Sequence, residues 1–311
     1  MRIFLTLIAV ALVAALSAAL VAPLFVDWSA QRGFIEKQLS ERVGAPVTIA
    51  GPIQVRLLPT PYLTAERVKV GYTSAGEEPA VVWDGMRLEL TLGGLFNGQL
   101  RFSEVDLDRP VLTLDQGLQS SMPGWGATFA ALADRVALDR LVVSKGRLNV
   151  AAHDAAPLAF ADIDLDASAR SLNGPFRGSG AVSTPRGARV EFQFASTEIA
   201  DAALPIKGDL DWGQGGPRAS FDGRLSVASD LSPSYAGALT VSGSLPGFDA
   251  GAPTPWRISG DLLADRSHAK LDALDLRLGP EERALELGGA AQADLGGDFV
   301  LDAQLSAKQL N

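Results

Sequence analysis

Residues 190–194 read Val190-Glu191-Phe192-Gln193-Phe194, a strict alternation of apolar and polar residues. Successive side chains of a β-strand point to opposite faces, so this stretch presents one apolar face and one polar face. The same period of two recurs at residues 47–49, 88–92, 105–108, 163–166, 239–242, 285–287 and 299–305. Strands with one wet face are typical of an antiparallel sheet. The sequence therefore predicts a mainly β protein.

Turn signals separate many of these runs. They are Asn97-Gly98, Asn173-Gly174-Pro175, Gly215-Gly216-Pro217, Gly279-Pro280 and Gly296-Gly297. Turns at intervals of about 8–12 residues are typical of a meander, a sandwich or a barrel. The composition agrees, because 32 Gly, 18 Pro and only 7% aromatic residues suit many short strands joined by turns.

The N-terminus carries a long apolar run. Residues 3–26 contain no charge, and Asp27 and Trp28 follow as a polar stop with an interface-type aromatic. A helix of roughly 20 residues spans a bilayer, so residues 1–27 are predicted to form an uncleaved transmembrane anchor. The alternative is a cleaved signal peptide ending at Ser17-Ala18-Ala19. Its apolar region should be only about 7–15 residues long, which favours the anchor.

Two helical segments are predicted within the chain. Residues 28–44 form an amphipathic helix, with Trp28, Ile35, Leu39 and Val43 near one face and Gly44 as its stop. A short helix is predicted at residues 126–137, where apolar residues recur at helical spacing. The repetitive β-body then covers residues 45–311, with a soft boundary near residues 122–137.

Charge and motifs argue against several classes of function. The net charge of −9 disfavours nucleic acid, and the absence of cysteine excludes disulfides and thiolate metal sites. No nucleotide-binding, zinc-hydrolase or nucleophile-elbow motif occurs. His153 and His268 sit in polar, turn-like contexts, and Ser267 and His268 should point to opposite faces of a strand. We expect no catalytic residues and no cofactor.

Three aspartates form a D-x-D-x-D run that resembles the start of a calcium loop. They are Asp162, Asp164 and Asp166. Ala167 stands where such a loop needs glycine, and Asn173 where it needs a bidentate glutamate. Ile163 and Leu165 make a good strand face between them. The run is therefore predicted to be the solvent side of a strand, and no metal site is expected.

Several stretches carry a family resemblance. They are Gly44-Ala45-Pro46-Val47-Thr48-Ile49-Ala50-Gly51-Pro52-Ile53, 57–63, Leu95-Phe96-Asn97-Gly98-Gln99-Leu100, 105–112, 141–148, 279–285 and 305–310. Together with the apolar N-terminus, their order resembles the AsmA family of Gram-negative envelope proteins. The resemblance implies an inner-membrane anchor, a periplasmic body and a long curled sheet with a hydrophobic groove. Family members are usually much longer, so the chain is expected to represent an N-terminal portion.

An alternating sheet must hide its apolar face, either around a ligand or against a second layer. The expected fold is an N-terminal transmembrane helix followed by a long, antiparallel, curled, repetitive sheet with a hydrophobic groove and a few short helices. The same residues would fill the core of a closed sandwich, and this alternative stays open. Groove candidates are Leu88, Leu90, Leu92, Val190, Phe192, Phe194, Leu225, Val227, Leu239, Val241, Leu301 and Leu305.

The functional prediction combines the pattern with the resemblance. An inner-membrane-anchored periplasmic protein would bind or conduct phospholipid along the groove and support outer-membrane lipid homeostasis and assembly. Its partners would be phospholipid and the inner membrane, with no nucleic acid. The alternative is a non-catalytic structural or assembly adaptor that binds envelope proteins at its sheet edges. An envelope hydrolase is disfavoured because no catalytic motif is present.

Overall fold

The structure is a computed structural model that describes residues 28–72, 79–93, 99–114, 133, 135–150, 158–227, 233–246, 253–265, 267–280, 284–294 and 300–309. The predicted anchor at residues 1–27 lies outside this range, as do His153, Asn97-Gly98 and Gly296-Gly297. Within the described ranges, no helix combines the length and the apolar character that crossing a bilayer requires.

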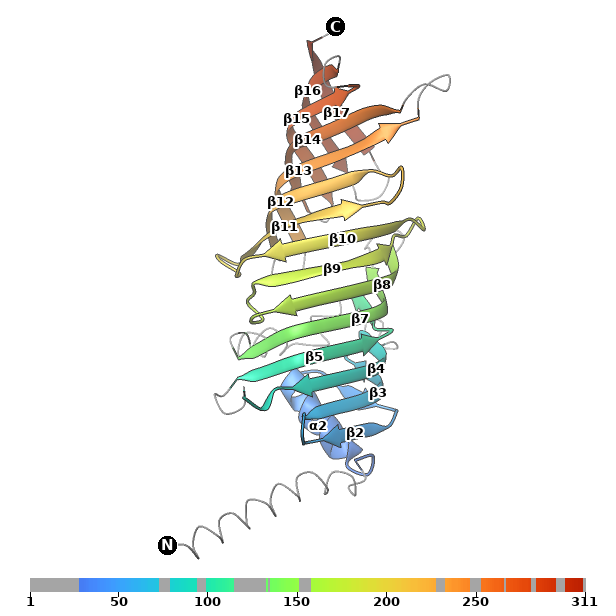
Figure 1. Cartoon of the computed structure of the whole chain (residues 1–311), viewed down its shortest axis with the longest axis vertical. Coiled ribbons are helices and arrows are strands. Elements are labelled where there is room, and N and C mark those ends of the chain that lie inside the picture. Colours follow the sequence, from blue (N-terminus) through green and yellow to red (C-terminus); the bar gives the residue numbers. More distant parts are fainter. Residues whose placement is uncertain are drawn as a thin grey trace, which may run out of the picture.

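One sheet of seventeen strands forms the described body (Figure 1). A single helix, α2 (Arg32–Val43), precedes it. The strands are β1 (Val47–Ile49), β2 (Ile53–Arg56), β3 (Tyr62–Val70), β4 (Val81–Leu90), β5 (Leu100–Asp108), β6 (Val111–Leu114), β7 (Val136–Val150), β8 (Leu158–Ala169), β9 (Phe176–Ser183), β10 (Arg189–Ser196), β11 (Ala203–Asp211), β12 (Arg218–Val227), β13 (Pro233–Leu245), β14 (Thr254–Ala264), β15 (His268–Leu278), β16 (Leu285–Asp294) and β17 (Val300–Gln309).

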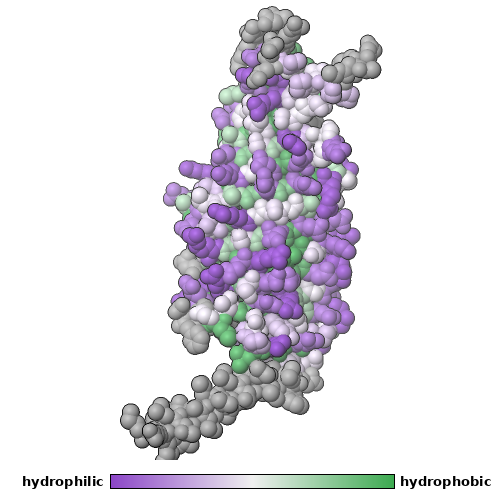
Figure 2. All heavy atoms as spheres, in the orientation of Figure 1, coloured by the Kyte–Doolittle hydropathy of each residue, from purple (hydrophilic) through white to green (hydrophobic). Residues whose placement is uncertain are grey.

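The strands stack along the long axis of the molecule, with α2 near one end and the C-terminus at the other (Figure 1). From β7 to β17 each strand pairs antiparallel with the next one along the chain. Hydrophilic side chains dominate the side seen in Figure 2, and hydrophobic ones show mainly between them and toward the α2 end. The predicted β-rich, repetitive architecture is therefore observed.

The sheet departs from a simple meander at two places. β1 and β2 both pair with β3, so together they form a split edge strand. β5 and β6 likewise share one line between β4 and β7, interrupted at Arg109-Pro110, where Arg109 has a φ of 46°. Both β5 and β6 pair with β7 in parallel. The sheet is thus mixed, and the expectation of a purely antiparallel sheet is wrong at this join.

A parallel pair needs a crossover of a dozen or more residues, which residues 115–135 supply. The short helix predicted at residues 126–137 falls within this connection and lies mostly outside the described residues. Its last two residues, Val136 and Ala137, instead begin β7. Their pairing with β5 overrides the local helical spacing.

Helix α2 packs on one end of the sheet. It begins at Arg32, after turns at residues 28–31, and ends at Gly44, whose φ of 72° suits glycine. Trp28, Ile35, Leu39 and Val43 pack against a buried cluster that β1, β2 and β3 contribute. Val68 in this cluster is only 2% exposed. This end of the sheet therefore has a closed hydrophobic core.

The same helix binds the backbone of the edge strand. Glu36 Oε1 accepts a hydrogen bond from the Ile49 N–H at 2.7 Å, and Ser40 Oγ accepts one from the Val47 N–H at 2.9 Å. Arg32 Nη2 donates to the Gly51 carbonyl at 3.1 Å. These side chains occupy edge groups that would otherwise be open to a further strand. Helix α2 thus covers both the face and the edge of the sheet at this end.

Candidate functional site

One row of apolar residues crosses the sheet without a break. Its members lie directly opposite one another on paired strands, so they share one face. From β2 to β17 the apolar row reads Ile53, Ala65, Met86, Leu107, Val143, Leu165, Gly180, Phe192, Leu210, Ala219, Val241, Ile258, Leu276, Leu287 and Ala307. No polar side chain interrupts it. Fourteen steps of about 4.8 Å make a path of roughly 67 Å.

A second row runs beside the first, two residues away from it on each strand. It reads Val55, Leu63, Leu88, Val105, Leu141, Ala167, Gly178, Phe194, Gly208, Phe221, Leu239 and Gly260. These residues are again all apolar or glycine. We call the surface built on these two rows, with the apolar residues that flank them, the apolar face.

The register places all but one of the predicted groove candidates on the apolar face. They are Leu88, Leu90, Val190, Phe192, Phe194, Leu225, Val227, Leu239, Val241, Leu301 and Leu305. Leu92 is the exception, because β4 ends at Leu90 and Leu92 lies in a helical turn. Many members of the apolar face are absent from that prediction, for example Leu210, Ile258 and Leu276. The alternation Leu204-Pro205-Ile206-Lys207-Gly208 on β11 was a readable signal for one of these strands.

Most side chains of the apolar face are only half-buried. Val190 is buried, at 3% exposure, whereas Val227 is 54% and Leu301 is 62% exposed. A sandwich would bury such residues under a second sheet about 10 Å away. All the described strands instead belong to one sheet, and α2 covers the face only at its β1–β4 end. Beyond β4, the described part of the chain places no second layer over these residues.

Aromatic rings on the apolar face lie against glycines of the neighbouring strand. A Cβ on Gly178 would lie 2.8 Å from the ring of Phe194, and a Cβ on Gly180 would lie 2.9 Å from that of Phe192. The position of a Cβ on Gly208 is likewise 2.7 Å from the ring of Phe221. Each ring thus covers a position that has no side chain of its own. The aromatic rings are therefore packed against their own sheet rather than against a second layer.

A family model described as the AsmA family matches residues 1–214, which is more than half of the chain. The chain belongs to the AsmA family. No curated protein and no solved structure matches it. The resemblance inferred from the sequence is confirmed, and AsmA membership is consistent with a role in envelope assembly or lipid transport.

The polar face of the AsmA-family sheet carries paired charges. Arg140 bonds Asp166 at 2.8 Å, and Arg189 bonds Asp164 at 3.0 Å. The Lys145 backbone N–H and the Arg189 guanidinium hold the pKa of Asp164 below its usual range. The calcium-like aspartate run therefore faces arginines and backbone across the strands. Among the residues that the structure describes, no group of three metal-ligating side chains converges.

A further carboxylate on the polar face, that of Asp106, is in a less favourable environment. Asp106 lies on the polar face of β5, and its burial, followed by the neighbouring charge of Glu104, raises its pKa. Arg87, directly opposite on β4, and Arg140 act in the other direction. Folding therefore disfavours the ionised form of the Asp106 carboxyl group.

The expectation that Ser267 and His268 point apart is wrong. Ser267 Oγ lies 2.8 Å from His268 Nδ1 and 3.0 Å from Asp265 Oδ1. The reason is local, because these residues form the turn between β14 and β15 and are not both in a strand. The carboxylate approaches the same ring nitrogen, at 3.8 Å, so it does not orient the imidazole against the hydroxyl as in a catalytic triad. Backbone N–H groups of Ser267 and His268 lower the pKa of Asp265.

Proposed function

We propose that this AsmA-family protein binds phospholipid through acyl chains laid along the apolar face and conducts it between membranes. The unbroken apolar row from Ile53 to Ala307 carries this proposal. Hydrocarbon transferred from water onto apolar surface is stabilised by roughly 25 cal/mol per Å². The face is long enough, and free enough of polar side chains, for acyl chains to lie along it at every strand.

The chemistry of the face favours hydrocarbon over polypeptide as its occupant. A peptide segment brings backbone N–H and C=O groups, each of which needs a hydrogen-bond partner when removed from water. The two apolar rows offer none. An acyl chain has no such requirement. The half-buried state of Phe192, Phe194 and Leu239 supports an open groove rather than a closed sandwich core.

The proposed setting is the cell envelope. Residues 1–27 would anchor the chain in the inner membrane, and the body would lie in the periplasm, where phospholipid passes toward the outer membrane. The uncharged run at residues 3–26 and the AsmA family match support this placement. The protein would then contribute to outer-membrane lipid homeostasis and assembly without catalysing a reaction.

A charge placed in the apolar row tests the proposal. Phe192→Asp and Val241→Asp each put a carboxylate on the face, and Thr240→Asp puts one on the polar face of the same strand as Val241. The full-length chain is purified in detergent. Bound phospholipid is measured by mass spectrometry, and folding is measured by thermal unfolding.

The proposal expects both row variants to stay folded and to lose most bound phospholipid, while Thr240→Asp retains it. A carboxylate in an open groove finds water in the lipid-free protein, so the fold tolerates it. Unfolding of both row variants would instead indicate a packed core, where an unpaired charge costs several kcal/mol, on the order of 3–5. Folded variants with undiminished lipid would refute the groove.

A further inference from the structure

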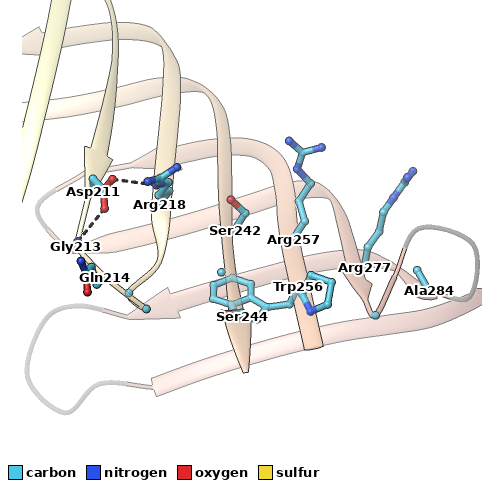
Figure 3. Close-up of a pocket in the computed structure, with 15 residues that line it drawn as sticks. Asp211, Gly213, Gln214, Arg218, Ser242, Ser244, Trp256, Arg257, Arg277 and Ala284 are labelled. Atoms are coloured by element: carbon cyan, nitrogen blue, oxygen red, sulfur yellow. Dashed lines mark hydrogen bonds and ion pairs between the residues drawn. The ribbon is translucent and has the colours of Figure 1, made fainter. Parts of the chain in front are cut away.

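A cavity of about 710 Å³ lies at one long rim of the sheet (Figure 3). The turn at residues 213–216 between β11 and β12, the end of β13 and the start of β14 line it. Gly279 and Ala284, which flank the β15–β16 turn, complete the wall. The cavity is therefore built where several strands end side by side.

The register brings three arginines into one row across this cavity. Arg218 lies opposite Ser242, Ser242 opposite Arg257, and Arg257 opposite Arg277. All four residues line the cavity, and Figure 3 shows Arg257 and Arg277 extending to the same side of the strands. Like charges placed directly opposite each other destabilise a sheet. The row thus concentrates positive charge in a chain whose net charge is −9.

Among the described residues, two of these arginines have carboxylate partners and the third has none. Arg218 Nε bonds Asp211 at 2.9 Å, and Arg277 Nε bonds Asp275 at 3.0 Å with Glu286 at 3.7 Å. Within the described ranges, which omit the turn residues 281–283, the side chain of Arg257 makes no ion pair or hydrogen bond. Its guanidinium is exposed and faces the cavity row. It can offer two parallel N–H donors, the geometry that phosphate accepts.

The preceding residue on β14, Trp256, lies on the apolar face beside this charge. Trp256 lies opposite Gly243 and Leu278, and a Cβ on Gly243 would lie 2.8 Å from its ring. Successive residues point to opposite faces, so near the start of β14 Trp256 lies on the apolar face and Arg257 on the polar face. Trp256 and Arg257 both line the cavity. The rim is therefore amphipathic over a distance of one residue.

We propose that this rim cavity binds the phosphate-bearing head group of the lipid whose acyl chains occupy the apolar face. The inference rests on the proposed function and assigns the phosphate of that phospholipid to named residues at the rim. Arg257 binds the phosphate, and Arg218 and Arg277 add positive potential. Trp256 packs against the glycerol end of the acyl chains, the position that tryptophan favours at membrane interfaces.

The test compares two lipids with the same acyl chains, dioleoylphosphatidylglycerol and dioleoylglycerol, on the full-length chain in detergent. Arg257→Gln removes the positive charge of Arg257. Arg224→Gln is the matched control, since Arg224 is exposed on the polar face of β12 and does not line the cavity. Glycerol 3-phosphate is added in a separate arm to distinguish a lipid head group from a free phosphate. Thermal unfolding checks that each variant is folded.

We expect the wild type to bind the phosphate-bearing lipid more tightly than dioleoylglycerol. Arg257→Gln should weaken binding of the phosphate-bearing lipid about three- to tenfold and leave binding of dioleoylglycerol unchanged. Arg224→Gln should match the wild type. Equal binding of both lipids by wild type and variant would overturn the head-group site while leaving the groove intact. Binding of neither lipid would overturn both proposals. Tight binding of glycerol 3-phosphate alone would reassign the cavity to a soluble phosphate and overturn the lipid assignment.

Discussion

Gly180 on β9 and Phe192 on β10 lie directly opposite each other, and the Phe192 ring fills the space that a side chain at position 180 would need. A Cβ on Gly180 would also collide with the Asp164 carbonyl oxygen. The glycine is therefore required by its neighbours on both sides. Its φ does not lie in the left-handed region, so the requirement is one of space.

Gly180→Ala should destabilise the body by about 1–3 kcal/mol, because the ring and the neighbouring strand must both move. Gly85→Ala is the control, since a Cβ there would meet only Asp108 Cβ, at an ordinary 3.5 Å. Urea unfolding of both variants measures the difference. Equal urea midpoints for the two variants would show that the Phe192 ring can move aside at no cost in stability.

The hydrogen bonds from α2 to the edge strand give a second prediction. Glu36→Ala leaves the Ile49 N–H without its acceptor, and Ile49 is only 3% exposed. We expect a loss of about 1–3 kcal/mol in unfolding free energy. Lys37→Ala, one position along on the exposed side of the helix, should change it by less than about 0.5 kcal/mol. A Glu36→Ala variant as stable as Lys37→Ala would mean that water replaces the carboxylate.

The raised pKa of Asp106 predicts that removing this carboxyl group stabilises the protein in a pH-dependent way. Its pKa is raised in the folded state, so the ionised form is penalised by folding. This penalty is absent below the unfolded pKa of about 3.9, appears as the pH rises through the folded pKa, and is complete above it. Asp106→Asn should therefore raise the melting temperature at pH 7 and leave it unchanged at pH 3. A variant that melts lower than the wild type at pH 7 would show that the attraction of Arg87 and Arg140 outweighs the burial.

The turn between β14 and β15 should be dispensable. Ser267→Ala and His268→Ala remove the hydroxyl–imidazole contact without touching the apolar face. Bound phospholipid, metal content and complementation of a deletion strain should all match the wild type. Loss of complementation by a folded His268→Ala protein would point to a catalytic role for this turn.

The proposed location can be checked in cells. Protease added to spheroplasts should digest the body while cytoplasmic markers survive, because the body would be periplasmic. N-terminal sequencing should find an uncleaved chain. A protected body, or a mature N-terminus near Leu20, would contradict the anchored topology.

Strands with an apolar residue at every second position were predictable, and β10 is the clearest case. β9 was missed, since its positions on the apolar face include Gly178 and Gly180, whose space belongs to rings of β10. That information lies in the neighbouring strand. β15 was missed because a bulge at Ala273, with a φ of 50°, puts Leu271 and Leu274 three residues apart on one face.

In the candidate site, too, some residues were predictable from the sequence and others were not. Alternation alone selected Phe192 and Val241, because the side of a strand follows from its period. Arg257 and its rim cavity were not predictable, since the row Arg218–Ser242–Arg257–Arg277 exists only once the register of four strands is set. The parallel join of β5 with β7 was equally hidden, because it depends on a crossover rather than on a turn.

That parallel join bears on the order in which the chain folds. Every pairing from β7 to β17 closes a short connection, so this half can assemble as successive hairpins. The pairing of β5 with β7 instead closes residues 109–135, and a longer loop costs more chain entropy before any contact forms. We therefore expect the α2 end and the β7–β17 meander to form early and separately. The rate at which the complete sheet appears would then be set at the seam between them.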